Sequence, residues 1–164
     1  MIDSTKKGEQ MIKDLILRKA SDLDMGNIIQ LEVDVFNCEQ QIPSALIPIP
    51  AENSPQWWCA LLDTSIVGAV AAWEDKNRVH WGRFATRQNY RGLHIGQKLA
   101  QFSLEALFSQ GIEEIYMDAR DITVKIVCDM GGKIIGKSTN FYESSVTPVV
   151  LYKKDYYRRK NLNG

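Results

Sequence analysis

The chain has 164 residues, and 45% of them are hydrophobic, so it can bury a sizeable core within one domain. Its 20 basic and 20 acidic residues give a formal net charge of zero. This balance argues against a general binder of nucleic acids or of anionic membranes, because such proteins are usually basic.

Three cysteines, Cys38, Cys59 and Cys128, are an odd number at wide spacings, which argues against a disulfide framework and against a zinc site. The N-terminal residues lack the apolar core of a signal peptide, and no segment reaches the roughly 18 continuous apolar residues of a membrane span. We therefore expect a reduced, cytoplasmic protein whose partners include neither a membrane nor a nucleic acid.

The first third of the chain predicts a strand, a helix and a long loop. Residues 1–13 are polar and are expected to be flexible, and residues 15–19 (LILRK) predict a strand. Ser21 or Asp22 can cap a helix whose apolar side chains recur at helical spacing. Residues 36–55 contain four prolines, which exclude a regular central element and predict an ordered loop of the kind that forms lids and binding sites.

The rest of the chain predicts most of a sheet and two helices. Further strands are expected at residues 56–62, 66–73, 78–86, 112–119, 134–137 and 146–152. The strands at 56–62 and 66–73 are expected to form a hairpin. A helix with a wide apolar face follows Gly96 and stops at Gly111, and another runs from Asp121 to Gly131. Residues 140–145 are expected to be a loop, and the basic tail from residue 153 a solvated end.

The stretch from residue 79 to residue 111 predicts a phosphate site. A strand meets a basic turn, then Gly92 and Gly96 with His94 between them, and then the long helix. Such a turn presents free backbone N–H groups and a helix N-terminus to an anion. The spacing excludes a Walker A loop, which needs four residues between its glycines, and a G-x-G-x-x-G dinucleotide fingerprint.

Residues 82–99 (GRFATRQNYRGLHIGQKL) resemble the pyrophosphate-binding segment of the GNAT acyltransferases, and the resemblance extends over residues 14–155. It is nearest to the ElaA/YjcF-type subgroup, through the blocks at residues 35–43, 82–85, 119–136 and 141–153. The family fold implied is α/β (α+β), with a mixed, mostly antiparallel sheet of six to seven strands, splayed at strands 4 and 5 and flanked by about four helices. Residues 156–164 would then be a polar C-terminal tail.

The resemblance also implies an activity and a cofactor site. The chain would transfer an acetyl group from acetyl-CoA (coenzyme A) to a primary amine of a small molecule or peptide, by direct attack in a ternary complex and without a metal. The pantetheine arm would lie along the backbone of Phe84, Ala85 and Thr86. The pyrophosphate would be held by N–H groups of seven consecutive residues: Arg91, Gly92, Leu93, His94, Ile95, Gly96 and Gln97.

Acetyl transfer needs a neutral amine, so a group must accept the amine's proton. Glu39, in the proline-rich loop, and Glu143, before the last strand, are our candidate catalytic residues, because both loops could border the acceptor cleft. Glu74, His80 and Asp118 are weaker candidates. The alternative is that each carboxylate only braces its own loop. The sequence does not name the acceptor, and a homodimer is possible.

Three positions depart from the family pattern. His94 replaces a glycine, and its ring is expected either to point to solvent or to contact a phosphate. Arg120 replaces an asparagine, and Val127 replaces the tyrosine that usually protonates the departing thiolate. These departures motivate an alternative function, in which a catalytically degenerate protein binds CoA and acts as a regulatory or interaction module.

Overall fold

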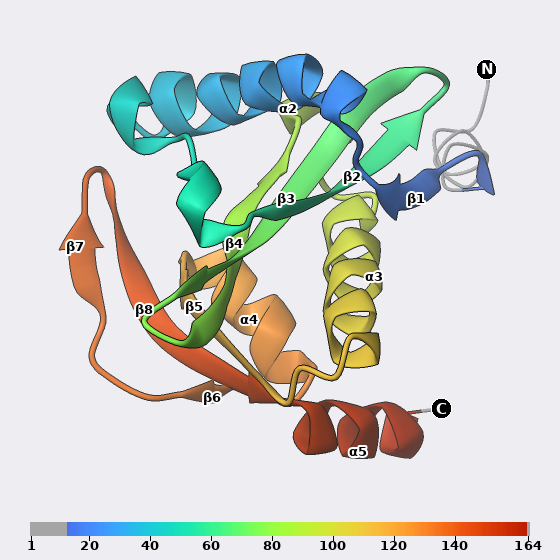
Figure 1. Ribbon diagram of the computed structural model, residues 1–164, viewed down its shortest axis with the longest axis vertical. Coiled ribbons are helices and arrows are strands. Elements are labelled where there is room, and N and C mark those ends of the chain that lie inside the picture. The colour runs from blue at the N-terminus through green and yellow to red at the C-terminus, as the bar shows by residue number, and fades with distance from the viewer. Residues whose placement is uncertain (1–12, 164) are drawn as a thin grey trace.

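The computed structural model describes residues 13–163 (Figure 1). The expectation for residues 1–13 therefore lies outside the described residues, except for Lys13. The strands of the described part form an eight-stranded sheet in the order β1-β2-β3-β4-β5-β8-β6, with β7 pairing to β8. They are β1 Ile16–Lys19, β2 Gln56–Leu62, β3 Ser65–Asp75, β4 Arg78–Thr86, β5 Glu114–Ala119, β6 Lys133–Ile134, β7 Thr139–Phe141 and β8 Ser144–Tyr152.

The predicted fold class, a mixed and mostly antiparallel sheet, is confirmed. Every pairing is antiparallel except that of β4 with β5, which is parallel. Those two strands pair only at Val79 with Ile115 and at His80 with Tyr116. Beyond these pairs β5 continues to pair with β8, while β4 pairs only with β3. The sheet therefore opens between β4 and β5, as predicted.

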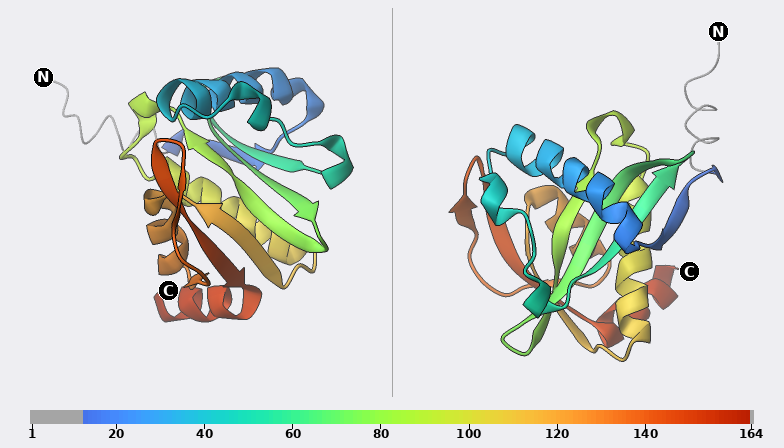
Figure 2. Two further views of the ribbon diagram at one scale, coloured as in Figure 1. Left: turned by 90° about the vertical axis from the view of Figure 1, so that its left-hand side faces the viewer. Right: turned by 45° about the horizontal axis from the view of Figure 1, so that its top comes forward.

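Helices cover both faces of the sheet. They are α2 Met25–Glu32, which continues as a π-helix at Val33–Glu39, α3 Ile95–Ser109, α4 Asp121–Asp129 and α5 Lys153–Asn163. Figure 2 shows α2 on one face of the sheet, and α3 with α4 on the other. The splayed edges of β4 and β5 thus lie between the π-helix on one side and the start of α4 on the other.

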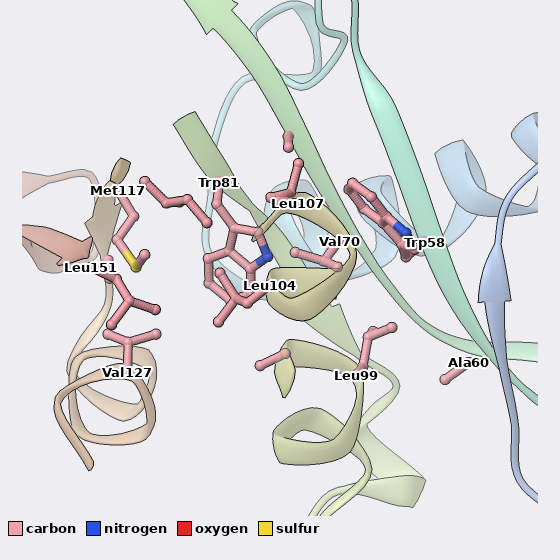
Figure 3. Packing of buried hydrophobic residues seen from close by; sticks show 14 of the residues in the cluster. Trp58, Ala60, Val70, Trp81, Leu99, Leu104, Leu107, Met117, Val127 and Leu151 are labelled. Carbon is pink, nitrogen blue, oxygen red and sulfur yellow. The ribbon is translucent and has the colours of Figure 1, made fainter. Parts of the chain in front are cut away.

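Alternating side chains of the central strands fill two cores. Trp57 and Cys59 of β2 belong to the cluster under α2, whereas Trp58 and Ala60 belong to the cluster under α3 and α4. Successive residues of a strand point to opposite faces, which accounts for this division. Figure 3 shows the second core, where the Trp81 side chain lies close to residues of α3. Its indole N–H donates to Ser103 at 2.9 Å, so its one polar group is satisfied.

Two predictions about the second half of the chain are wrong. The expected loop at residues 140–145 contains most of a short hairpin, because β7 pairs with the start of β8. The tail is not a solvated end, since residues 153–163 form α5. Tyr156 on this helix is only 3% exposed and packs against Phe108, so the tail closes one end of the core.

Candidate acyl-transfer site

Two cavities meet at the opening between β4 and β5. The larger, of about 670 Å³, lies beside the N-terminus of α3, and the smaller, of about 340 Å³, lies between the two strands. Five residues line both cavities and so mark where they meet: Phe36, Gln40, Phe84, Arg120 and Thr123. The site is therefore a two-part cleft with a shared wall.

The larger cavity gathers most of the predicted cofactor-binding residues. Nine of the ten line it: Phe84, Ala85, Thr86, Arg91, Gly92, His94, Ile95, Gly96 and Gln97. The exception is Leu93, whose side chain packs against the core under α3. The first N–H groups of a helix have no partner one turn earlier, so the start of α3 offers this cavity free donors and a partial positive charge.

The glycine turn owes its shape to two left-handed residues. Gly92 has a φ of +84°, and a Cβ there would meet no atom within 4 Å, so its open side faces free space. His94 has a φ of +62°, which a non-glycine residue adopts only with strain. This is the conformation that accounts for a glycine at that position in the family pattern. The His94 side chain is exposed, and its Nδ1 lies 2.9 Å from the side-chain oxygen of Gln97.

Gly96 lets α3 approach β4 closely. A Cβ at this position would lie 3.0 Å from Cζ of Phe84 and 3.5 Å from the hydroxyl of Thr86. The two positions therefore favour glycine for different reasons: Gly92 adopts a left-handed conformation, and Gly96 leaves room between helix α3 and strand β4.

Arg91 ties the turn to the rest of the cleft. Its Nε donates to the carbonyl of Thr86 at 3.0 Å, and its Nη2 donates to the carboxylate of Glu39 at 2.8 Å. Its backbone N–H donates to the carbonyl of Gln88 at 3.3 Å, so this N–H is already engaged. The contribution of Arg91 to an anion site is therefore its charged side chain.

A β-bulge in β4 shapes the smaller cavity. Ala85 pairs with Ala69 and Gly82 pairs with Ala71, so β4 uses one residue more than β3 between these pairs. Arg83, inside the bulge, has a φ of +54°. Bulges re-aim side chains, and strained backbone of this kind is concentrated at functional sites. The Arg83 guanidinium lines the smaller cavity and donates to the carbonyls of Leu46 and Ile47 at 2.9 and 3.1 Å.

The shared wall carries two buried polar atoms that have no partner. They are Nη2 of Arg120, a donor, and Oε1 of Gln40, an acceptor. The other amino group of Arg120 donates to the carbonyl of Phe141 at 2.8 Å. Sequence reasoning noted Arg120 only as a departure from the family and did not single out Gln40. The sequence offered one signal for each residue: Arg120 directly precedes the predicted helix cap Asp121, and Gln40 lies in the proline-rich loop, both within blocks that resemble the family.

The two candidate catalytic carboxylates occupy different surroundings. Glu39 lines the larger cavity, where it forms the ion pair with Arg91. Glu143 is exposed in the turn between β7 and β8 and lines neither cavity. Asp118, one of the weaker candidates, lines the smaller cavity from β5. The ring of His80 stacks on Trp73, with centroids 5.9 Å apart.

Sequence reasoning missed Glu32, at the end of α2. Its side chain is buried, and neither carboxylate oxygen has a hydrogen-bond partner. Burial raises the pKa of Glu32 well above the usual range, although the charge of Arg83 opposes this effect. Nothing in the amphipathic pattern of residues 25–35 distinguishes this glutamate from a solvent-facing one.

Of the three positions that depart from the family pattern, Val127 is part of the core, whereas His94 is exposed and Arg120 lines the cleft. Val127, on α4, is fully buried, so the position where the family has a tyrosine is filled by an aliphatic side chain. Burial raises the pKa of the neighbouring Cys128 thiol, which lines neither cavity. This thiol therefore has the surroundings of a structural cysteine.

Among residues 13–163, no helix combines the length and the apolar character needed to cross a membrane. Within the same range, no cluster of three or more histidine, cysteine, aspartate or glutamate side chains could hold a metal ion.

A family model described as the acetyltransferase (GNAT) family matches residues 14–125. No curated protein sequence matches the chain. Among solved structures, ElaA from Escherichia coli superposes with a TM-score of 0.71 at 16% identity, over 82% of this chain and 98% of that one. An acyl-CoA N-acyltransferase from Pseudomonas aeruginosa gives 0.70 at 15% identity, over 84% and 97% of the two chains.

A GNAT-family acetyltransferase from Staphylococcus aureus Mu50 gives a TM-score of 0.64 at 18% identity, over 84% of this chain and 98% of that one. At such identities these likenesses show a shared fold, and the shared fold extends over nearly the whole of each relative.

Proposed function

Because the chain belongs to the acetyltransferase (GNAT) family, we propose that it transfers an acetyl group from acetyl-CoA to a primary amine, by direct attack in a ternary complex. The amine would belong to a small molecule or a peptide. The observation that carries this proposal is the two-part cleft, in which a cavity beside a helix N-terminus joins a second cavity between splayed strands.

The residues of the larger cavity fit acetyl-CoA. The start of α3 and the open turn at Gly92 would hold the pyrophosphate, with the cation of Arg91 beside them. Single helix-terminus effects amount to about 0.3–1 kcal/mol, so several N–H groups must act together. The pantetheine arm would follow β4 toward the shared wall. When bound, acetyl-CoA supplies the acetyl group as a thioester with an electrophilic carbonyl carbon.

The backbone of β4 would polarise that carbonyl. Arg83 and Phe84 lie outside the pairing with β3, so the bulge frees backbone groups at the edge of the cleft. Such fixed donors stabilise charge that develops on an acyl oxygen. In the transfer, the amine nitrogen forms a bond to the carbonyl carbon, the carbon–sulfur bond breaks, and the amine gives up one proton. The sulfur leaves as a thiolate, which a thiol pKa of about 8.5 permits near neutral pH.

For the proton we propose Glu39 and Glu143 as acceptors, acting directly or through water. Glu39 is supported by its place in the cleft, and Glu143 only by its place in a family-like block. Asp118, on the wall of the smaller cavity, is the rival carboxylate. The variants Glu39→Gln, Glu143→Gln and Asp118→Asn separate them, because loss of a base lowers kcat about 10²–10⁴-fold. A variant that keeps the wild-type pH profile excludes its residue.

The test of the function combines two measurements. Isothermal titration with acetyl-CoA reports binding, and release of free thiol across a panel of amines reports transfer. Binding together with amine-dependent release supports the proposal. If the protein binds acetyl-CoA but turns over no acceptor, the regulatory alternative is favoured, which the aliphatic Val127 in place of a tyrosine also motivates. Absence of binding contradicts both functions.

Three free cysteines support our further proposal of a cytoplasmic location.

A further inference from the structure

The smaller cavity is lined by two arginines that form no ion pair in the described part of the chain. Arg83 donates only to backbone carbonyls, and so does Arg120. Within residues 13–163 neither forms an ion pair, whereas Arg18, Arg87, Arg91 and Arg158 each do. Arginine stays protonated in proteins, so both side chains bring positive charge to the cavity.

The buried carboxyl group of Glu32 makes no hydrogen bond to either arginine. Glu32 interacts electrostatically with Arg83, but its own burial favours the neutral acid. The carboxylate that lines this cavity is that of Asp118, which is exposed to solvent. Partly buried cations without a counter-ion are costly, so an anionic ligand in this cavity would lower that cost.

The shared wall shows where such a ligand would bind. The described residues contain four with buried side-chain polar atoms that lack partners, and two of them, Gln40 and Arg120, line both cavities. Arg120 offers a hydrogen-bond donor and Gln40 an acceptor. At this wall, the Arg120 guanidinium can therefore donate to an acidic oxygen of a ligand, and the Gln40 side-chain oxygen can accept from an N–H group of the same ligand.

The remainder of the smaller cavity is largely apolar. Its walls include Ile42, Leu46, Ile47, Met117 and Phe141. An acceptor that fills the cavity must therefore combine an apolar body with polar groups that gather at one end, beside the shared wall.

From these contacts we infer that the acceptor is an amine with a carboxylate close to the amino group, as in an apolar α-amino acid. Arg120 and Arg83 bind the carboxylate, and Gln40 accepts a hydrogen bond from the amino group. The inference rests on the proposed function, because the amine has to meet the thioester at the shared wall. In an α-amino acid one carbon joins the two groups, so the carboxylate reaches Arg120 while the nitrogen faces the larger cavity.

The experiment compares matched acceptors. Leucine, methionine and phenylalanine are each paired with the corresponding primary amide, which keeps the amino group and the side chain but lacks the negative charge. Binding to the CoA-saturated protein is measured by calorimetry, and transfer from acetyl-CoA by thiol release. An α-amino amide is less basic than the amino acid, so amine ionisation alone favours the amide. We expect the acids to bind roughly 10- to 100-fold more tightly than the amides.

Three variants assign the preference to residues. Arg120→Gln and Arg83→Gln are each expected to reduce the ratio of acid to amide affinity at least tenfold, mainly through KM. Arg78→Gln is the matched control, because Arg78 lies at the other end of β4, over the ring of Tyr116 and away from both cavities. The control should keep the wild-type ratio.

Amides that bind as tightly as the acids overturn the inference, as does an Arg120→Gln variant that weakens both acceptors equally. Transfer to simple amines with no preference for acids leaves the acetyltransferase function in place and contradicts only the carboxylate site. Tight binding of acids without thiol release supports the site and contradicts the transfer.

Discussion

At the scale of single residues, backbone conformation and burial decide what each position contributes. Gly92 and His94 share a left-handed conformation, yet only the glycine adopts it without strain. Glu32 and Glu39 lie seven residues apart along one continuous helix, yet Glu32 is buried without hydrogen-bond partners and Glu39 is paired with Arg91 in the cleft. Residue type alone therefore does not show whether a glycine or histidine shapes the anion-binding turn, or whether a glutamate lies in the core, in the cleft or at the surface.

We expect Gly92→Glu to abolish CoA binding while the protein stays folded. The new side chain meets no atom within 4 Å of its Cβ, so it is tolerated sterically at a cost of about 1–2 kcal/mol for the left-handed conformation. Its negative charge, however, faces the proposed pyrophosphate site. Titration calorimetry measures the loss, and Gly92→Asn is the control, because asparagine tolerates the same conformation without the charge. Unchanged CoA affinity in the glutamate variant would falsify the proposal that this turn binds the pyrophosphate.

Glu32→Gln is expected to stabilise the protein increasingly as pH rises. The folded pKa of Glu32 lies above its ordinary value of 4.5, so between the two values the folded state binds more protons than the unfolded state. Wild-type stability therefore falls with rising pH in this window, by up to about 1.4 kcal/mol per pH unit, and the glutamine variant lacks this loss.

Urea unfolding of both proteins from about pH 5 to about pH 8 measures the widening gap. The exposed Glu52, substituted by glutamine, is the control for losing a carboxylate at the surface. A gap for Glu32→Gln that stays constant over this pH range would contradict the raised pKa of Glu32.

At the scale of elements, the site depends on how closely α3 approaches β4 and how early β4 leaves β5. Gly96 permits the first, because a side chain there would meet the ring of Phe84. The second follows from a parallel pairing of only two residue pairs. The bulge at Arg83 then turns side chains of β4 into the opening. The cleft is thus a product of strand divergence, with Phe84 on the wall common to both cavities.

Gly96→Ala should weaken CoA binding about tenfold and lower the free energy of unfolding by up to about 2 kcal/mol. The new methyl group would lie 3.0 Å from Phe84 Cζ, so the ring, which lines both cavities, must shift by a few tenths of an ångström. Overpacking usually costs about 1–3 kcal/mol, and the gain from replacing glycine in a helix, about 0.5–1 kcal/mol, offsets part of that cost. Calorimetry and urea unfolding measure the two effects.

Gly26→Ala is the matched control, since a Cβ at this position of α2 meets nothing within 4 Å. It is expected to raise stability by about 0.5–1 kcal/mol and to leave binding unchanged. If both variants bind CoA as the wild type does, the position of the Phe84 ring does not control the cleft.

At the scale of the whole molecule, the C-terminal helix completes the core that supports α3 and α4. The Tyr156 hydroxyl donates to Glu105 of α3 at 2.8 Å, and its ring packs on Phe108. A Cβ on Gly131, after α4, would lie 2.9 Å from the carbonyl oxygen of Asp155, so α5 also lies against the end of α4. The helix therefore connects the two elements that flank the larger cavity.

Tyr156→Ala is expected to lower the free energy of unfolding by about 3–5 kcal/mol, the usual cost of removing a buried aromatic side chain. Tyr156→Phe loses only the hydrogen bond to Glu105 and should cost about 0.5–1.5 kcal/mol. Urea unfolding of the three proteins gives both differences. A cost below 1 kcal/mol for the alanine variant would show that α5 contributes little to the core.

Except for β7 and α5, the sequence by itself determined the order of strands and helices, together with the glycine turn and the family. These features are local, since periodicity, turn residues and motif spacing act over a few neighbouring positions. Nine of the ten residues that the family resemblance predicts for the cofactor site line the larger cavity. The local signals failed for residues 153–163, because the polar composition of this segment hides the single buried face that Tyr156 gives it.

The tertiary structure alone decided how the cleft is charged. Arg83, Arg120, Gln40 and Glu32 come from different elements, and only the divergence of β4 from β5 brings the first three around one opening. Whether an arginine has a counter-ion, or a glutamate is buried, depends on neighbours far away in the sequence. The glycine turn therefore revealed the proposed cofactor, whereas the chemistry of the acceptor depends on long-range packing that no local pattern records.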